Sequence, residues 1–114
     1  KPLADLMLQR GATVTVAHSQ TENMAELTRS ADIICVAVGI PKFLTEDMVS
    51  PGTTVIDIGT TYDENGKVTG DVDFENVAEK THAITPVPGG VGPVTKLMVF
   101  KQMIDRLEEV TGIV

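Results

Sequence analysis

A run of prolines and glycines is the segment of this sequence best suited to holding a flat ligand. Residues 86–95 read Pro-Val-Pro-Gly-Gly-Val-Gly-Pro-Val-Thr. Proline fixes φ and removes a backbone donor, whereas glycine permits close approach because it has no Cβ. Helical spacing resumes after Gly92, and the first amides of a helix attract anions and polarised carbonyls. Such a run is often only a turn, but this context predicts a stiff wall, almost bare of side chains, against a ligand.

Residues near position 18 have the chemistry needed to read the ribose end of a dinucleotide. His18 and Ser19 directly follow a predicted strand, where this kind of site contacts the ribose. Ser19 can donate to a phosphate, and His18 can stack or donate. No acidic residue, which would favour NAD, occurs there before Glu22. Taken alone, both residues equally fit the commoner roles of loop and helix-cap residues.

Two glycines that end predicted strands could let the chain pass beside a bound nucleotide. Gly39 follows Val38, and Gly59 precedes Thr60; each glycine also fits a simple turn. The glycine-rich phosphate turn of a dinucleotide site, between a strand and a helix, is absent from the sequence. We expect its place to be just before Lys1, where the lack of an initial Met suggests an interior cut.

The remaining polar residues indicate structural roles. Asp57 lies inside an apolar strand and must be hydrogen-bonded if it is buried. Cys35 lies in an apolar run, so we expect a buried and unreactive core thiol. His82 is expected at the surface. Solvated caps, rather than metal ligands, are the expected roles of four acidic residues in turns, which are Asp63, Glu64, Asp71 and Asp73.

The elements that must position these residues alternate along the chain. Helical spacing is predicted for residues 3–10, 21–30, 45–49, 73–80 and from 92 onward. Strands are predicted at 13–17, 33–38, 54–58 and 83–85, with a surface turn at 63–66. This alternation predicts an α/β fold, a Rossmann-like doubly wound parallel sheet with helices on both faces, truncated at its N-terminal edge. Its ligand is expected at the carboxyl ends of the strands.

Size and composition restrict the chain, residues 1–114, to one small domain of ordinary hydrophobic content, 42%. The formal charge of −7 argues against a nucleic-acid partner. No apolar run approaches the roughly 20 residues that span a bilayer, so no membrane segment is expected. A single cysteine cannot form an internal disulfide, which favours a reducing, cytoplasmic location.

Residues 86–95 closely resemble the C-terminal motif of the bifunctional methylenetetrahydrofolate dehydrogenase/cyclohydrolase family. Further pieces follow in the family's order over essentially the whole chain, at residues 1–2, 12–21, 31–33, 36–39, 55–59 and 70–72. The family has an N-terminal folate-binding catalytic domain followed by a Rossmann-like NADP domain, with the active site between them. This chain resembles most of the second domain. The family's catalytic Lys and Tyr, and its folate-holding Gln and Asp, belong to the first.

The resemblance implies an enzyme of one-carbon metabolism and purine biosynthesis, cytoplasmic and homodimeric. It would oxidise 5,10-methylenetetrahydrofolate with NADP to the methenyl cation, then hydrolyse this cation to 10-formyltetrahydrofolate. The chain would contain no catalytic residue and no metal ligand, and alone it would be inactive. Cofactor contacts are implied for His18, Ser19, Val38, Gly39, Gly59, Thr60 and Thr95. A wall shared by folate and nicotinamide is implied for Pro88, Gly89, Gly90 and Gly92.

Departures from the family pattern leave alternatives open. Gln20 stands where the family often has Arg or Lys, so NAD is possible in place of NADP. A noncatalytic nucleotide-binding or interaction domain of a degenerate family member is the main rival interpretation. A shikimate-type dehydrogenase is a third, and the proline-glycine run argues against it.

Overall fold

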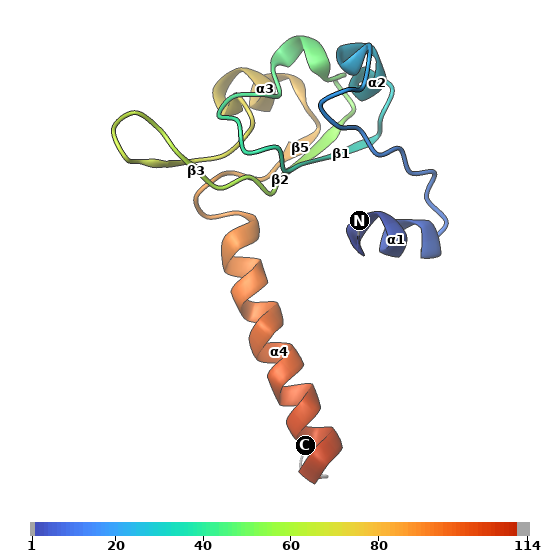
Figure 1. Ribbon diagram of the computed structural model, residues 1–114, viewed down its shortest axis with the longest axis vertical. Helices are drawn as coiled ribbons and strands as arrows, with labels where there is room; N and C mark the ends of the chain where they lie inside the picture. Colours follow the sequence, from blue (N-terminus) through green and yellow to red (C-terminus); the bar gives the residue numbers. More distant parts are fainter. Residues whose placement is uncertain (1, 112–114) are drawn as a thin grey trace.

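Three parallel strands form the centre of the molecule. The structure, a computed structural model, describes residues 2–111. Strands β1 (Ile33–Val36), β2 (Thr54–Asp57) and β5 (Ala83–Ile84) lie in the order β1-β2-β5, as Figure 1 shows. Because all three run in the same direction, the segments that follow them leave from one edge. The predicted α/β fold with a parallel sheet is confirmed.

One face of this sheet carries the hydrophobic core. Helices α2 (Met24–Arg29) and α3 (Phe74–Lys80) and the short η1 (Glu46–Met48) lie along that face (Figure 1). Successive side chains of a strand point to opposite faces, so the side chains of Ile34 and Val36 enter the core. The buried apolar residues are Ile34, Val36, Leu44, Met48, Val49, Val55, Val72 and Val77.

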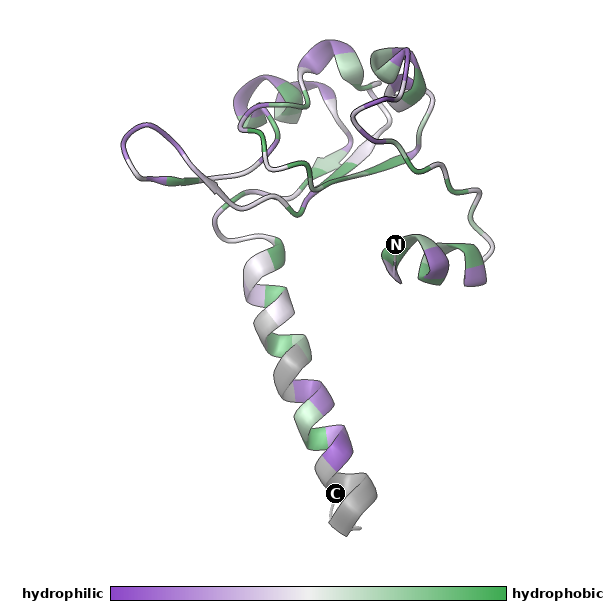
Figure 2. Ribbon diagram, in the orientation of Figure 1, coloured by the Kyte–Doolittle hydropathy of each residue, from purple (hydrophilic) through white to green (hydrophobic). Residues whose placement is uncertain are grey.

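The other side of the sheet is more open. Helices α1 (Pro2–Gln9) and α4 (Val91–Thr111) lie on that side and extend away from the strands (Figure 1). Green, hydrophobic stretches mark both helices in Figure 2. Their exposed large apolar side chains are Leu3, Leu6 and Leu8 on α1, and Val94, Leu97, Met98, Met103 and Ile104 on α4.

Cys35 lies on this open side, so the prediction of a buried core thiol is wrong. Within β1, Ile33 and Cys35 are exposed while Ile34 and Val36 are buried. The apolar run was expected to be covered on both faces, but the helices of the core cover only one. Partial desolvation still raises the pKa of the Cys35 thiol.

The predicted strand at residues 13–17 is absent from the structure. Residues 12–18 take no regular secondary structure. In a doubly wound sheet, the strand after the first helix pairs with the strand that precedes that helix. Helix α1 is the first element of the described chain, so this segment has no neighbouring strand with which to exchange backbone hydrogen bonds.

Two other predicted elements, the first helix and the surface turn at 63–66, are confirmed. Helix α1 lies within one residue of the predicted range 3–10 at each end, and Gly11 just beyond it has a φ of 85°, the left-handed conformation typical of a glycine that follows a helix. The surface turn at 63–66 joins the antiparallel strands β3 (Thr61–Tyr62) and β4 (Val68–Thr69). No described helix is long and apolar enough to cross a membrane.

Candidate functional site

The segments after β1 and β2 meet at the carboxyl edge of the sheet, as predicted. The amides of Val38 and Gly39 donate to Asp71 Oδ2 at 2.7 and 2.9 Å. A Cβ built on Gly59 would overlap the same Asp71 carboxyl group. The structure therefore brings Val38 and Gly39 beside Gly59 and Thr60, and Asp71 lies between the two segments.

Gly39 is required by its backbone conformation rather than by crowding. Its φ of 75° lies in the left-handed region that side chains disfavour. A Cβ built there would meet no heavy atom within 4 Å. This turn is therefore open to a ligand. Gly59, in contrast, is buried, and its neighbour Thr60 is exposed. Of these two residues, Thr60 is therefore the one placed to contact a ligand.

Two buried carboxylates organise this edge. Asp57, at the end of β2, is 3% exposed and accepts from the amides of Gly59 (3.0 Å), Asp71 (3.1 Å) and Val72 (3.1 Å). This confirms the structural role predicted for Asp57. Asp71 is 0% exposed and also accepts from the Thr61 hydroxyl at 3.3 Å.

The prediction that Asp71 is a solvated turn residue is wrong, and sequence reasoning missed its place in the site. A polar residue after a glycine resembles an ordinary turn. It is buried because residues 70–72 fold back over the end of β2, where Asp57 binds their amides. The one available signal was Asp57 itself, which required donors from some other segment of the chain.

The proline-glycine run leaves β5 at the same edge. The residue just before the run is fixed to β2, because Thr85 Oγ1 accepts from the Asp57 amide at 2.9 Å. The Val87–Pro88 peptide is cis, and Gly89 has a φ of 102°. A Cβ on Gly90 would overlap the Pro86 carbonyl oxygen, so Gly90 permits a tight turn before α4 begins.

Beyond this turn, the candidate residues of the run are open to solvent. Pro88, Gly89, Gly92 and Thr95 are all exposed. A Cβ on Gly92 would meet no heavy atom within 4 Å, so nothing in the described chain explains a glycine there. Thr95 Oγ1 donates to the Val91 carbonyl oxygen at 3.0 Å within α4.

His18 and Ser19 lie in a self-contained turn. The His18 amide donates to Thr21 Oγ1 at 2.9 Å, the Gln20 amide donates to His18 Nδ1 at 3.2 Å, and the Thr21 amide donates to the His18 carbonyl at 2.9 Å. Helix α2 begins at Met24, three residues after the predicted start of helical spacing at residue 21. The N-cap is Asn23, which has a φ of 53° and makes no side-chain capping bond.

The structure does not join this turn to the rest of the candidate site. Within residues 2–111, the hydrogen bonds of residues 18–21 given by the structure are all local. The described chain therefore shows His18 and Ser19 exposed, without contacts that fix them beside Val38 or Gly59.

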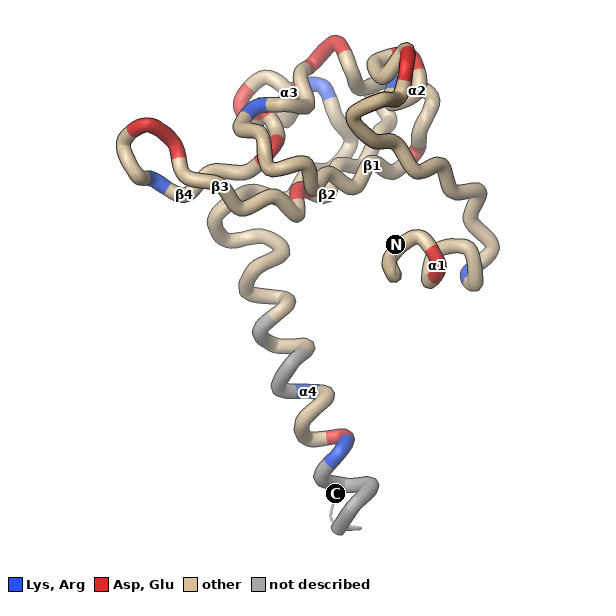
Figure 3. The backbone as a smooth tube through the Cα atoms, viewed as in Figure 1, with Lys and Arg blue, Asp and Glu red and all other residues tan. Residues whose placement is uncertain are grey.

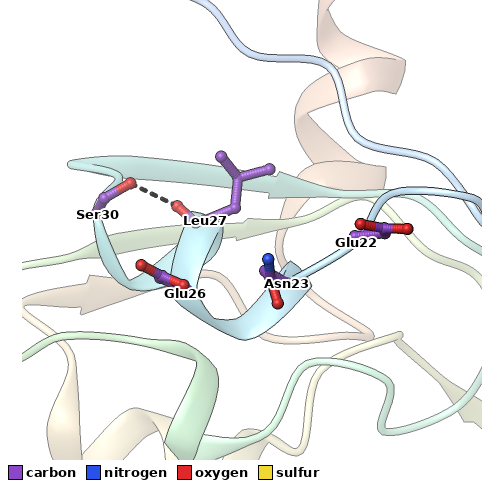
Figure 4. Close-up of a pocket in the computed structure, with 5 residues that line it drawn as sticks. All are labelled: Glu22, Asn23, Glu26, Leu27 and Ser30. Carbon is purple, nitrogen blue, oxygen red and sulfur yellow. Dashed lines mark hydrogen bonds between the residues drawn. The ribbon is translucent and has the colours of Figure 1, made fainter.

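A surface hollow of about 390 Å³ lies elsewhere, along the length of α2 (Figure 4). Glu22, Asn23, Glu26, Leu27 and Ser30 line it. None of them is a predicted site residue. Two carboxyl side chains make this hollow unsuited to the phosphates of a dinucleotide, because like charges repel. The carboxyl edge of the sheet remains the better candidate.

The carboxyl edge suits a flat ring held by backbone and apolar contacts. Val38, Ile40 and Ile58 are 46%, 53% and 39% exposed there, and the glycines at 39 and 92 leave open space. None of the candidate residues is Lys or Arg, and Figure 3 shows basic positions scattered singly over the described chain. The edge therefore fits the rings of a dinucleotide better than its phosphates. Among the described residues, no cluster of side chains could hold a metal ion.

Solved structures similar to this chain include bifunctional methylenetetrahydrofolate dehydrogenase/cyclohydrolase enzymes. The Campylobacter jejuni bifunctional enzyme FolD, a methylenetetrahydrofolate dehydrogenase/cyclohydrolase, aligns with a TM-score of 0.88 and 47% identity over 91% of this chain and 37% of that one. The Trypanosoma brucei enzyme, complexed with NADP and an inhibitor, aligns with a TM-score of 0.83 and 40% identity, over 90% of this chain and 37% of that one.

Sequence relatives agree with the structural ones. The "Bifunctional protein FolD" of Campylobacter hominis is 58% identical over 91% of this chain, and that of Lactobacillus acidophilus is 57% identical over 98%. The chain spans 37% and 39% of their respective lengths. Residues 1–111 match the protein-family model described as the tetrahydrofolate dehydrogenase/cyclohydrolase NAD(P)-binding domain. The chain therefore belongs to the tetrahydrofolate dehydrogenase/cyclohydrolase family, as an NAD(P)-binding domain.

Proposed function

We propose that this chain is the NADP-binding part of an enzyme that oxidises 5,10-methylenetetrahydrofolate and hydrolyses the methenyl product to 10-formyltetrahydrofolate. The observation that carries the proposal is the position of the proline-glycine run. It leaves β5 at the edge where the open Gly39 turn and Thr60 also lie. The Trypanosoma brucei relative, complexed with NADP, supports the same choice of cofactor. NAD is the alternative, because Gln20 gives the 2′-phosphate no charged partner.

In this proposal, the residues of the chain bind and orient rather than carry protons. When bound, NADP accepts a hydride from the folate methylene carbon. Val38, Gly39 and Thr60 would line the nucleotide, and Ser19 with His18 would contact the 2′-phosphate. Hydride transfer depends mainly on the placement of donor and acceptor, which a rigid backbone wall can provide.

The wall residues would act through shape. Pro88, Gly89, Gly90 and Gly92 have no titratable side chain, and Thr95, near the nicotinamide, has only a hydroxyl group. The hydrolysis step needs an acid or base, so we assign that group to a part of the protein outside this chain. This follows the family resemblance, in which a Lys of the preceding domain has this role.

The cellular setting is also a proposal. The family resemblance favours a cytoplasmic homodimer that works in one-carbon metabolism and purine biosynthesis. A noncatalytic role is not favoured, because relatives with 57% and 58% identity are named as bifunctional proteins.

The proposal is tested by two assays of the full-length protein that carries this domain. We expect it to form methenyltetrahydrofolate from the methylene compound with NADP, and to hydrolyse added methenyltetrahydrofolate without a dinucleotide. The isolated chain, residues 1–114, should do neither, because it would supply only one side of the cleft. A full-length protein inactive in both assays would favour the noncatalytic alternative, and an active isolated chain would show that the chemistry lies within it.

A further inference from the structure

The turn that follows β1 is fastened to one short segment of the chain at both ends. At its start, the amides of Val38 and Gly39 donate to the Asp71 carboxylate at 2.7 and 2.9 Å. At its end, the Leu44 amide donates to the Asp71 carbonyl, and Leu44 accepts from the Asp73 amide, both at 2.9 Å. The position of residues 38–44 therefore depends on residues 71–73.

The Asp71 side chain is unusual because this fully buried carboxylate accepts hydrogen bonds from a solvent-exposed turn. Its exposed fraction is 0%, whereas Val38 is 46% exposed. One oxygen, Oδ2, accepts both turn amides, and the other accepts from Thr61 Oγ1. A carboxylate strengthens hydrogen bonds with such donors because it is charged. The turn therefore keeps its backbone ordered while its outer surface stays free for a ligand.

Asp57 fixes the segment from which Asp71 acts. Its Oδ1 accepts from the amides of Gly59 and Asp71, and its Oδ2 accepts from that of Val72. Asp57 belongs to β2, the central strand of the described sheet. A continuous series of contacts thus leads from the sheet through Asp57 and Asp71 to the turn at 38–39.

We infer that Asp71 is a positioning residue for dinucleotide binding, which holds the Val38–Gly39 turn in the conformation that contacts the cofactor. The inference rests on the proposed function. It adds Asp71, which contacts the turn from its buried side and is not one of the cofactor contacts proposed above. Without the carboxylate, two neighbouring amides lose their acceptor, and the start of the turn, where Gly39 has a φ of 75°, is no longer held, although the backbone bonds of Leu44 still hold its end.

The experiment compares Asp71→Ala, Asp71→Asn and the control Asp63→Asn in the full-length protein. Asp63 is matched to Asp71, because one of its oxygens also accepts from two backbone amides, those of Asn65 and Lys67, at 2.9 Å each. It lies in the β3–β4 hairpin turn rather than at the candidate site. The readouts are the Kd for NADP by calorimetry, the KM for NADP in oxidation, and the rate of methenyltetrahydrofolate hydrolysis without dinucleotide.

We expect Asp71→Ala to raise both the Kd and the KM for NADP about tenfold, the size of effect expected from leaving partly buried donors unpaired. Hydrolysis should change less than about twofold, because it needs no dinucleotide. Asp71→Asn should have a smaller effect, since its amide oxygen can still accept from both turn amides. Asp63→Asn should leave every readout at the wild-type value.

Equal losses in hydrolysis and NADP binding would overturn the inference, because Asp71 would then only support the fold. Unchanged NADP binding in Asp71→Ala would overturn it as well. If Asp71→Ala does not fold, Asp71→Asn decides, and NADP binding equal to wild type in that variant would count against the inference. A wild-type protein that binds no NADP would instead refute the proposed function itself, and that result is seen before any variant is made.

Discussion

Two glycine–aspartate pairs determine how closely the strand-end segments approach. A Cβ on Gly59 would overlap the Asp71 carboxyl group, and a Cβ on Gly70 would overlap that of Asp57. Neither glycine has a left-handed φ. Space for a carboxylate, rather than backbone freedom, therefore explains both glycines.

Gly70→Ala tests this explanation away from the proposed ligand contacts. We expect a loss of about 1–3 kcal/mol in the free energy of unfolding, because the new methyl group must displace the buried Asp57 carboxylate from its three amides. The measurement is urea unfolding of the full-length protein.

Gly52→Ala is the matched control for Gly70→Ala. Gly52 also lacks a left-handed φ, and its Cβ would meet no heavy atom within 4 Å. Its effect should stay within about 0.5 kcal/mol. Equal effects of the two substitutions would show that close approach of a carboxylate does not explain Gly70.

Cys35 gives a prediction about pH. Desolvation raises the pKa of its thiol, and the thiolate is the reactive form. At any given pH below that pKa, less thiolate is present than in an unfolded chain. As the pH is raised, the rate of Cys35 alkylation by iodoacetamide should therefore begin to increase at a higher pH in the native isolated chain than in the same chain in urea. Superimposable pH profiles would contradict the shift.

Asp57 and Asp71 show what could be predicted at the level of residues. Asp57 interrupts an apolar strand, and this local pattern was enough to predict a hydrogen-bonded, structural carboxylate. Asp71 has no such local pattern. Its burial results from contacts between residues 14 apart in sequence, and a single sequence does not display such contacts.

At the level of elements, apolar pattern predicted the strands that have partners. β1 and β2 pair along their full length, and both were expected within two residues of their observed ends. Residues 13–17 have an equally strong β-branched pattern but form no strand. Strand propensity measures fit to a sheet, so the pattern alone yields no strand when no neighbouring strand is present.

Hydrogen exchange tests this explanation for residues 13–17. In the isolated chain, we expect their amides to exchange much faster than those of β2, because no ladder hydrogen bonds protect them. In the full-length protein they should be protected to a degree comparable with β2, if a preceding strand pairs with them. Fast exchange in both proteins would mean that this segment is a loop in the whole enzyme too.

The whole molecule is extended for its size. Its radius of gyration is 16.5 Å, against about 13 Å for a compact domain of this length. Helices α1 and α4 both extend away from the sheet (Figure 1), and the 21 residues of α4 alone span about 30 Å. Its helical spacing was predicted from the sequence, whereas its lack of packing was not. A periodic apolar pattern predicts a buried face without saying which segment covers it.

The self-contained turn at residues 18–21 has a practical consequence for redesign of this protein. The turn closes through its own bonds to Thr21 and His18, while Asp57 and Asp71 hold the carboxyl edge of the sheet independently. The residues that we propose to select between NADP and NAD should therefore tolerate exchange without disturbing the turns that Asp57 and Asp71 hold. Under the proposed function, Gln20 is the first position at which to test a change of cofactor preference, because its exchange should leave the carboxyl edge of the sheet unchanged.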